Sequence, residues 1–210
     1  QAEYLPRTSY DECVDWICNL LDEAASSLPA IRTNKEDYGL ATSVGAKAVK
    51  AKMLLYAASP LFNGNSSFYS NFTDKSGSQL MPLTYDPNKW VKAKTAIKEA
   101  IDLAEQNGHA LYVKQDYKIG NEDANPYPAA GPVRCLRTSL VDWDSRNPEV
   151  LLAETRSEGS YGIQNKSLPF VTDGWAWNGV GPTWTMLNRF YTKNGLPWDE
   201  DPEYKDKDKL

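Results

Sequence analysis

The residues best suited to bind a ligand are aromatic side chains in a loop-rich stretch, residues 157–182. Tyr161, Trp175 and Trp177 lie among Gly and Asn residues, where no helical or strand periodicity accounts for the burial of their rings. The flat face of such a ring can meet the apolar C–H face of a neutral sugar, while nearby polar side chains bind its hydroxyls. The alternative, that the rings fold back and pack onto helices, stays open. The predicted ligand-binding residues are Tyr161, Asp173, Trp175, Trp177 and Asn178.

Catalytic chemistry finds little support in the sequence. The single histidine, His109, follows a helix-ending glycine, where a polar side chain more often caps backbone carbonyls than acts as a base. Acidic residues that could serve a glycosidase are present, but the sequence pairs no two of them: Asp142, Asp144, Glu154, Glu158 and Asp173. No cysteine or histidine cluster suits zinc, and no segment matches a calcium-binding loop. We therefore predict no catalytic residue, no metal site and no cofactor.

Composition narrows the class of protein further. The net charge is −5 and no stripe of Lys and Arg is present, which argues against a nucleic-acid partner. No apolar run approaches 20 residues, so no segment is expected to span a membrane. The 12 Tyr and 7 Trp are an unusually large set of amphipathic rings, which fits a protein that binds a ligand by stacking.

Three helices are expected to form the scaffold that carries these loops. The first begins at Ser9, because Ser9-Tyr-Asp-Glu12 has the spacing of a capping box, and it ends before Pro29. The third follows Asp86-Pro87 and closes at Asn107-Gly108. Its predicted apolar stripe is Trp90, Ala93, Ile97, Ala100, Ile101 and Ala104.

The second helix lies in the stretch 46–64 and should be the middle one. It has a bulky stripe, Val49, Met53 and Tyr56, and a flatter stripe on the opposite side, Ala48, Ala51, Leu55 and Ala58. Two apolar faces need two neighbours. Three lysines are expected to keep their charges in water between the stripes: Lys47, Lys50 and Lys52. Pro60 and the Asn63-Gly64 turn end the helix.

The remaining segments look less regular. Residues 65–85 form a long polar insertion with too few spaced apolar residues for a regular element, and residues 149–154 fit a strand or an extended segment. The spacing of Ala93, Ile97 and Ala100 matches the second helix of a tetratricopeptide repeat, in which small residues let helices approach closely. We predict a mainly α fold with a tetratricopeptide-like helical scaffold, long irregular loops and a few short strands.

Several segments together resemble the SusD/RagB family of Bacteroidetes. They are Leu55-Tyr-Ala-Ala-Ser-Pro-Leu-Phe-Asn63, the Trp90 helix, Asn147-Pro-Glu-Val150 and Asn178-Gly-Val-Gly-Pro-Thr183, in the same order as in the family. The resemblance runs nearly end to end, although members of the family are a good deal longer. It indicates one SusD-like unit over residues 1–210, part of a longer protein, with a helical scaffold over about 9–108 and a loop-rich, ligand-facing region over about 109–210.

The resemblance implies a function as well as a fold. Members of the family are outer-membrane, lipid-anchored, cell-surface proteins that bind oligosaccharides without cleaving them and pass them to a SusC-like TonB-dependent transporter. Membrane contact would be made only through a lipid anchor that this chain does not contain. Two alternatives remain open: a tetratricopeptide-type module that binds peptides, and a hydrolase that acts on glycans. The sugar and its linkage are left undefined.

Overall fold

The computed structural model describes residues 6–114, 131–140, 147–155, 162–168 and 177–204. Within them the fold is mainly α, as predicted, and β structure is limited to two isolated bridges, Thr73–Gln79 and Tyr191–Pro197. The helices in chain order are α1 (Tyr10–Ser27), the short 3-10 helix η1 (Lys35–Asp37), α2 (Ser43–Ala58), α3 (Ser66–Tyr69), α4 (Asn88–Gln106), α5 (Pro132–Ser139), α6 (Ile163–Ser167) and α7 (Trp184–Leu187).

The chain divides into two compact units, residues 1–155 and residues 156–210. A single functional unit over residues 1–210 stays a prediction. None of the helices in the described ranges is long and apolar enough to cross a membrane.

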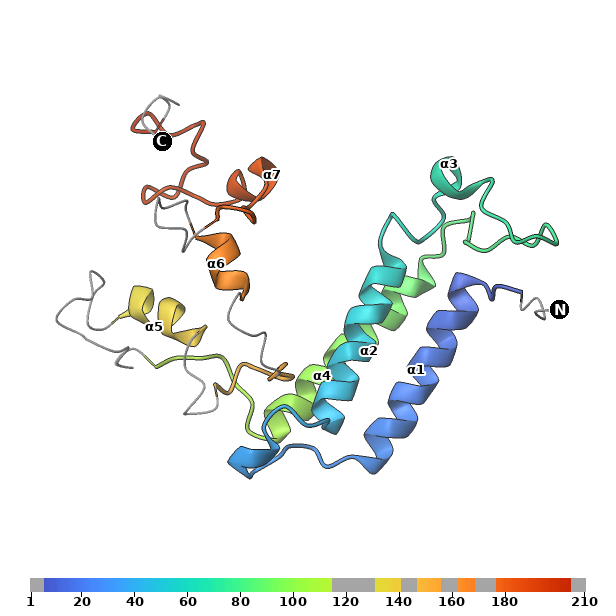
Figure 1. Ribbon diagram of the computed structural model, residues 1–210, viewed down its shortest axis with the longest axis horizontal. Coiled ribbons are helices and arrows are strands. Elements are labelled where there is room, and N and C mark those ends of the chain that lie inside the picture. Colours follow the sequence, from blue (N-terminus) through green and yellow to red (C-terminus); the bar gives the residue numbers. More distant parts are fainter. Residues whose placement is uncertain (1–5, 115–130, 141–146, 156–161, 169–176, 205–210) are drawn as a thin grey trace. The chain divides into compact units, whose positions relative to one another are not determined.

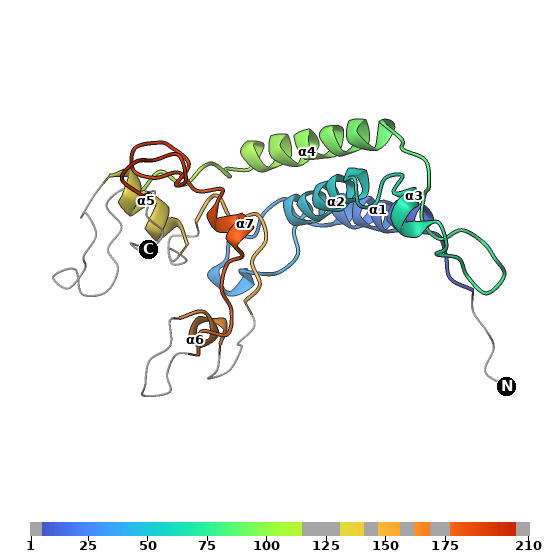
Figure 2. The same cartoon turned by 90° about the horizontal axis from the view of Figure 1, so that it is seen from above.

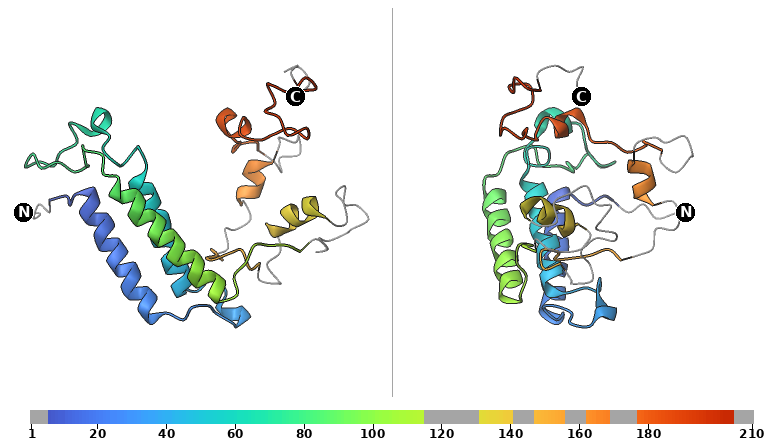
Figure 3. Two further views of the ribbon diagram at one scale, coloured as in Figure 1. Left: turned by 180° about the vertical axis from the view of Figure 1, so that it is seen from behind. Right: turned by 90° about the vertical axis from the view of Figure 1, so that its left-hand side faces the viewer.

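Three antiparallel helices, α1, α2 and α4, form a layer in the first unit (Figure 1). α2 packs against α1 on one side and α4 on the other, so the predicted middle position of this helix is confirmed (Figures 2 and 3). The predicted capping box also forms, because the Ser9 side chain accepts from the Glu12 backbone N–H and the Glu12 carboxylate accepts from the Ser9 backbone N–H. α1 ends at Ser27, just before Pro29.

The faces of α2 differ from the predicted stripes. Towards α1, Ala57 packs with Val14 and Cys18. Towards α4, Ala51 packs with Ala96 and Ala100. Of the predicted flatter stripe, Ala51 and Ala58 are buried and Leu55 is exposed. Of the predicted bulky stripe, Met53 packs against the α1 contact, whereas Val49 and Tyr56 are exposed. The two stripes are therefore confirmed in part, because Ala side chains lie at both contacts.

α4 confirms the small residues of its predicted stripe. Ala93, Ala100 and Ala104 are buried as predicted, and Ala96 is buried as well, while the predicted Trp90 and Ile101 are exposed. Ile97 packs at the edge of the α2 contact, so the tetratricopeptide spacing correctly marks the face that meets α2. The helix ends in a Schellman motif, in which the backbone N–H of Gly108 donates to Glu105 O and that of His109 to Ala104 O.

Two of the three lysines on α2 are paired rather than free in water. The Asp22 carboxylate on α1 accepts from Lys47 Nζ at 2.7 Å and from Lys50 Nζ at 2.5 Å. Lys47 Nζ also lies 3.8 Å from a Glu99 oxygen on α4. The prediction that the charges stay in water was therefore wrong for Lys47 and Lys50, because both ammonium groups pair with a carboxylate on a neighbouring helix. Lys52 is exposed, as predicted.

The turn after α2 explains why its sequence is so distinctive. The Asn63 side chain is buried, donates to Asp86 O at 2.9 Å and accepts from the Asp86 backbone N–H at 2.9 Å. The Phe62 ring stacks on Tyr10 of α1 with ring centroids 5.2 Å apart. Gly64 has φ +80°, and a Cβ there would lie 2.3 Å from Tyr85 N. Asn63 and Gly64 thus hold the two ends of the insertion, residues 65–85, close together.

The insertion itself, residues 65–85, contains more structure than expected. Asn65 caps the single-turn helix α3 by accepting from the Phe68 backbone N–H, and the Thr73–Gln79 bridge closes a small hairpin. Leu80 and Met81 are buried at its return, and Leu80 O accepts from the Tyr10 backbone N–H at 2.8 Å. The prediction of no regular element here was wrong because side-chain caps, rather than apolar periodicity, order short segments.

Candidate functional site

The second unit carries the part of the predicted ligand platform that the structure describes. Trp177 and Asn178 lie in a segment without regular secondary structure after α6. The other predicted members, Tyr161, Asp173 and Trp175, lie outside the described residues.

Backbone hydrogen bonds attach this segment to the end of α6. Trp177 N–H donates to Asn165 O at 3.0 Å and Asn178 N–H to Leu168 O at 3.0 Å. Gly179 and Val180 both donate to Lys166 O, at 2.7 and 2.9 Å. Carbonyls at a helix C-terminus have no partner within the helix, so this segment satisfies them. Residues 177–180, which we call the strap, are thereby held in one conformation.

The residues of the strap are exposed to solvent. Trp177 is 41% exposed, and Asn178 is also exposed. Asn178 has φ +47°, the one positive φ at a non-glycine position in the described ranges. Asn tolerates the left-handed region better than other side chains, and such a residue usually marks a functional or turn constraint. An indole ring and a carboxamide at adjacent, pinned positions can stack on a sugar and bind its hydroxyls.

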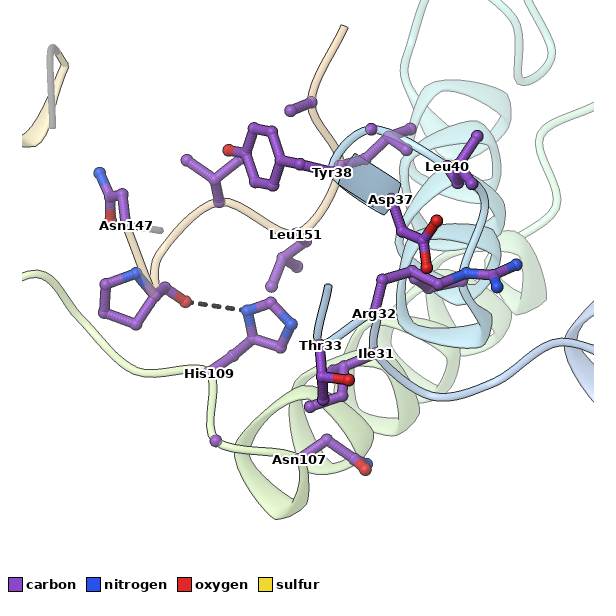
Figure 4. Close-up of a pocket in the computed structure, with 17 residues that line it drawn as sticks. Ile31, Arg32, Thr33, Asp37, Tyr38, Leu40, Asn107, His109, Asn147 and Leu151 are labelled. Carbon is purple, nitrogen blue, oxygen red and sulfur yellow. Dashed lines mark hydrogen bonds between the residues drawn. The ribbon is translucent and has the colours of Figure 1, made fainter. Parts of the chain in front are cut away.

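A second candidate is a cavity of about 330 Å³ in the first unit (Figure 4). Three segments far apart in sequence line it: residues 31–42 between α1 and α2, residues 107–109 after α4, and residues 147–153. Ile31, Leu40, Val150, Leu151 and Leu152 supply apolar surface, and Thr33, Asp37, Tyr38, Asn107 and His109 supply polar groups.

The Asn147-Pro-Glu-Val150 segment forms one wall of this cavity and is fixed by hydrogen bonds. Asn147 is buried, its Oδ1 accepts from the Glu149 backbone N–H at 2.9 Å, and its Nδ2 donates to Ser139 O. The Glu149 carboxylate accepts from the Tyr112 backbone N–H at 3.0 Å. Residues 149–154 form no strand and are not extended throughout: Glu149 lies in a turn closed by the Val150 N–H to Asn147 O bond, and Leu151 and Leu152 lie in a bend, so neither predicted conformation is found over the whole segment.

His109 contributes to this wall in a way that its sequence position did not reveal. Its Nδ1 lies 2.9 Å from Pro148 O, 39 residues away, and not against a carbonyl of α4 (Figure 4). The carbonyl can only accept, so Nδ1 carries the proton and Nε2 of the neutral ring is an acceptor. The side-chain capping prediction was therefore wrong, because the His109 backbone already caps the helix.

Sequence reasoning missed this cavity for a clear reason. Its lining comes from loops that carry no motif, and the one available signal was the pair formed by the single His and the Asn147-Pro segment. Among the acidic residues considered for hydrolysis, Glu154 is exposed, and Asp142, Asp144, Glu158 and Asp173 lie outside the described ranges. In those ranges no group of three His, Cys, Asp or Glu side chains could hold a metal ion.

Comparison with known proteins places the fold among solved structures. This chain is similar to BT4246, a protein of Bacteroides thetaiotaomicron. The match has 32% sequence identity, covers 97% of this chain and has a TM-score of 0.67. A selenomethionine form of BT4246 matches at 32% identity over 96% of this chain, with a TM-score of 0.63. In both comparisons the chain spans 37% of the longer protein. No protein-family model and no curated protein matches the sequence.

Proposed function

We propose that this chain is a portion of a SusD/RagB-type protein that binds oligosaccharides without cleaving them. In this proposal the protein is lipid-anchored at the cell surface on the outer membrane and delivers its ligand to a SusC-like TonB-dependent transporter. The similarity to a Bacteroides protein over nearly the whole chain supports this source, and the order of the family-like segments supports this family.

The observation that carries the binding function is the strap. Trp177 is partly exposed on a segment fixed by backbone hydrogen bonds, so a ligand that stacks on the ring meets a surface that is already ordered. Binding to an ordered surface avoids the entropy cost of fixing a loop. Asn178 adds a donor and an acceptor beside the ring.

Titration of neutral oligosaccharides by isothermal calorimetry tests the proposal. We expect Trp177→Ala to weaken binding by about 10-fold, which corresponds to about 1.4 kcal/mol, because the stacking surface is lost. The double variant with Trp175→Ala should lose more if both rings contact the sugar. Unchanged affinity in the double variant would remove these rings from the site.

Two further variants test whether the loss of binding is specific to the Trp177 ring and whether Asn178 also contacts the ligand. Trp16→Ala removes a tryptophan that is 64% exposed on α1, and it should leave the affinity unchanged. Asn178→Gly keeps a backbone that accepts positive φ but removes the carboxamide. Weaker binding in Asn178→Gly, with an unchanged melting temperature, would assign a hydrogen bond to the ligand to this side chain.

A further inference from the structure

The cavity near His109 has no part in the proposed function. All of its described lining belongs to the first unit, whereas the strap belongs to the second. What this cavity binds can therefore be inferred from its own residues, without reference to oligosaccharides at the strap.

Size is the first constraint on an occupant. The volume of about 330 Å³ lies near the lower end of the range for small-molecule sites, about 300 to 1,000 Å³. Two bonds between distant segments hold the walls, from His109 to Pro148 O and from the Tyr112 backbone N–H to the Glu149 carboxylate, and a local bond from the Glu149 N–H to Asn147 Oδ1 adds to them. A cavity of this size with fixed walls suits one ring-sized molecule better than a chain of several rings.

Charge is the second constraint. Arg32 lines the cavity, and its positive charge could bind an anion, but its Nε and Nη2 both donate to Ala41 O, each at 3.3 Å. The guanidinium therefore supports the backbone ahead of α2. Asp37 also lines the cavity and would repel an anion. These two groups disfavour an anionic occupant.

Hydrogen-bonding capacity is the third constraint. Because His109 Nδ1–H donates to Pro148 O, Nε2 of the neutral ring is an acceptor, and Figure 4 shows it on the side of the ring away from that bond, towards Thr33. Thr33 and Tyr38 add hydroxyls, which donate and accept. Leu151 supplies an apolar surface between Tyr38 and His109 (Figure 4). Such a set matches a molecule with several hydroxyls on an apolar ring.

We propose that this cavity binds one small, neutral, hydroxyl-bearing molecule of monosaccharide size, with His109 Nε2 accepting a hydrogen bond from a ligand hydroxyl and Leu151 contacting the apolar face of the ring. The site is separate from the strap. Trp177→Ala therefore leaves it intact, and failure of one proposal does not entail failure of the other.

Ligand-observed NMR and calorimetry with a panel of neutral monosaccharides test this site in the intact protein. We expect at least one sugar to bind with a Kd of about 1 mM or tighter, equivalent to about 4 kcal/mol. Sugar acids of the same size should bind at least several-fold more weakly. Absence of binding across the neutral panel, or equal binding of the sugar acids, would overturn the proposal.

Two variants locate the site. Leu151→Trp fills the cavity and should abolish monosaccharide binding, while Leu20→Trp, at an exposed position on α1, should not. His109→Asn keeps a donor for Pro148 O but removes the Nε2 acceptor, so it should weaken binding about 5-fold with little change in melting temperature. If Leu151→Trp does not fold, His109→Asn decides the question. Full affinity in His109→Asn, or in a folded Leu151→Trp, would place the ligand elsewhere.

Discussion

The helix layer of the first unit and the described part of the second unit are stabilised by different kinds of interaction. In the layer, small apolar side chains of α1, α2 and α4 are buried against one another. At residues 162, 165–168 and 177–204, no apolar side chain is among the buried ones, and the buried group is a carboxylate, Asp201, at 1% exposed. Apolar burial determines the layer, whereas hydrogen bonds determine the local conformation of the second unit.

Asp201 shows how a loop is held without an apolar core. Its carboxylate accepts from Thr192 Oγ1 at 2.5 Å, from Asn194 Nδ2 at 3.0 Å and from the Glu203 backbone N–H at 2.9 Å. The Thr192 hydroxyl is the main reason that the pKa of Asp201 lies below its ordinary value. Lys193 and Glu203 add an ion pair at 2.5 Å. A segment held in this way depends on few groups, so one substitution should release it.

The largest effect is expected at Gly64, in the turn that ends α2. Gly64→Ala places a Cβ 2.3 Å from Tyr85 N and forces Ala into φ +80°. The left-handed conformation costs about 1 to 2 kcal/mol and the steric overlap about 1 to 3 kcal/mol. We expect the free energy of unfolding to fall by about 3 kcal/mol, measured by urea denaturation.

Gly77 is the matched control for this substitution. It has a similar φ of +89°, but a Cβ there meets nothing within 4 Å. Gly77→Ala should therefore cost only the conformational part, about 1 to 2 kcal/mol. Equal losses in the two variants would show that the close approach of Gly64 to Tyr85 contributes nothing.

The second expected effect is local and lies in the second unit. Asp201→Asn keeps an oxygen for the Glu203 N–H but cannot accept from both Thr192 and Asn194. We expect faster amide exchange and faster limited proteolysis within residues 188–204, with unchanged exchange in α1, α2 and α4. Asp199→Asn, an exposed neighbour, should change neither. Loss of protection throughout the helix layer would contradict the difference between the two regions.

Sequence reasoning succeeded where a local chemical rule determines the structure. The capping box at Ser9, the stop near Pro29 and the glycine ending of α4 each depend on neighbouring residues alone, and all three are confirmed. The middle position of α2 also followed from its two apolar faces. These signals depend on residues that are close in sequence, so they can be interpreted without knowledge of the tertiary structure.

Errors arose where distant residues decide the outcome. Tyr56 and Trp90 were assigned to apolar stripes from helical spacing, yet both are exposed, and Ala57 and Ala96 occupy the contacts. His109 was assigned to the end of its own helix, and its partner is Pro148. Of the predicted ligand site, the structure describes Trp177 and Asn178, which are adjacent in sequence, so their proximity tests no long-range prediction.

The smallest expected effect concerns the polar link across the helix layer, the Asp22 carboxylate with Lys47 and Lys50. Partial burial alone would raise the pKa of Asp22, but the hydrogen bonds from the two lysines outweigh it and lower the pKa below the ordinary value. A lowered folded-state pKa adds stability above the unfolded-state value, and this contribution is lost as pH falls through the folded-state pKa. The link therefore stabilises the protein at neutral pH and not in strong acid.

Asp22→Asn should lower the free energy of unfolding at pH 7 by about 1 kcal/mol or less, because the Asp22 side chain is 39% exposed and solvent screens the pairs. The difference from wild type should begin to shrink as the pH falls below about 4, the ordinary pKa of Asp in the unfolded chain, and should vanish once the pH is below the lower folded-state pKa. It should also shrink in 1 M salt. Asp15→Asn, exposed on the same helix, controls for the loss of one negative charge. If the loss of unfolding free energy in Asp22→Asn stays constant from neutral pH into strong acid, the charge of Asp22 does not stabilise the contact between α1 and α2. Side-chain shape and packing would then stabilise the helix layer at its surface as well as in its core.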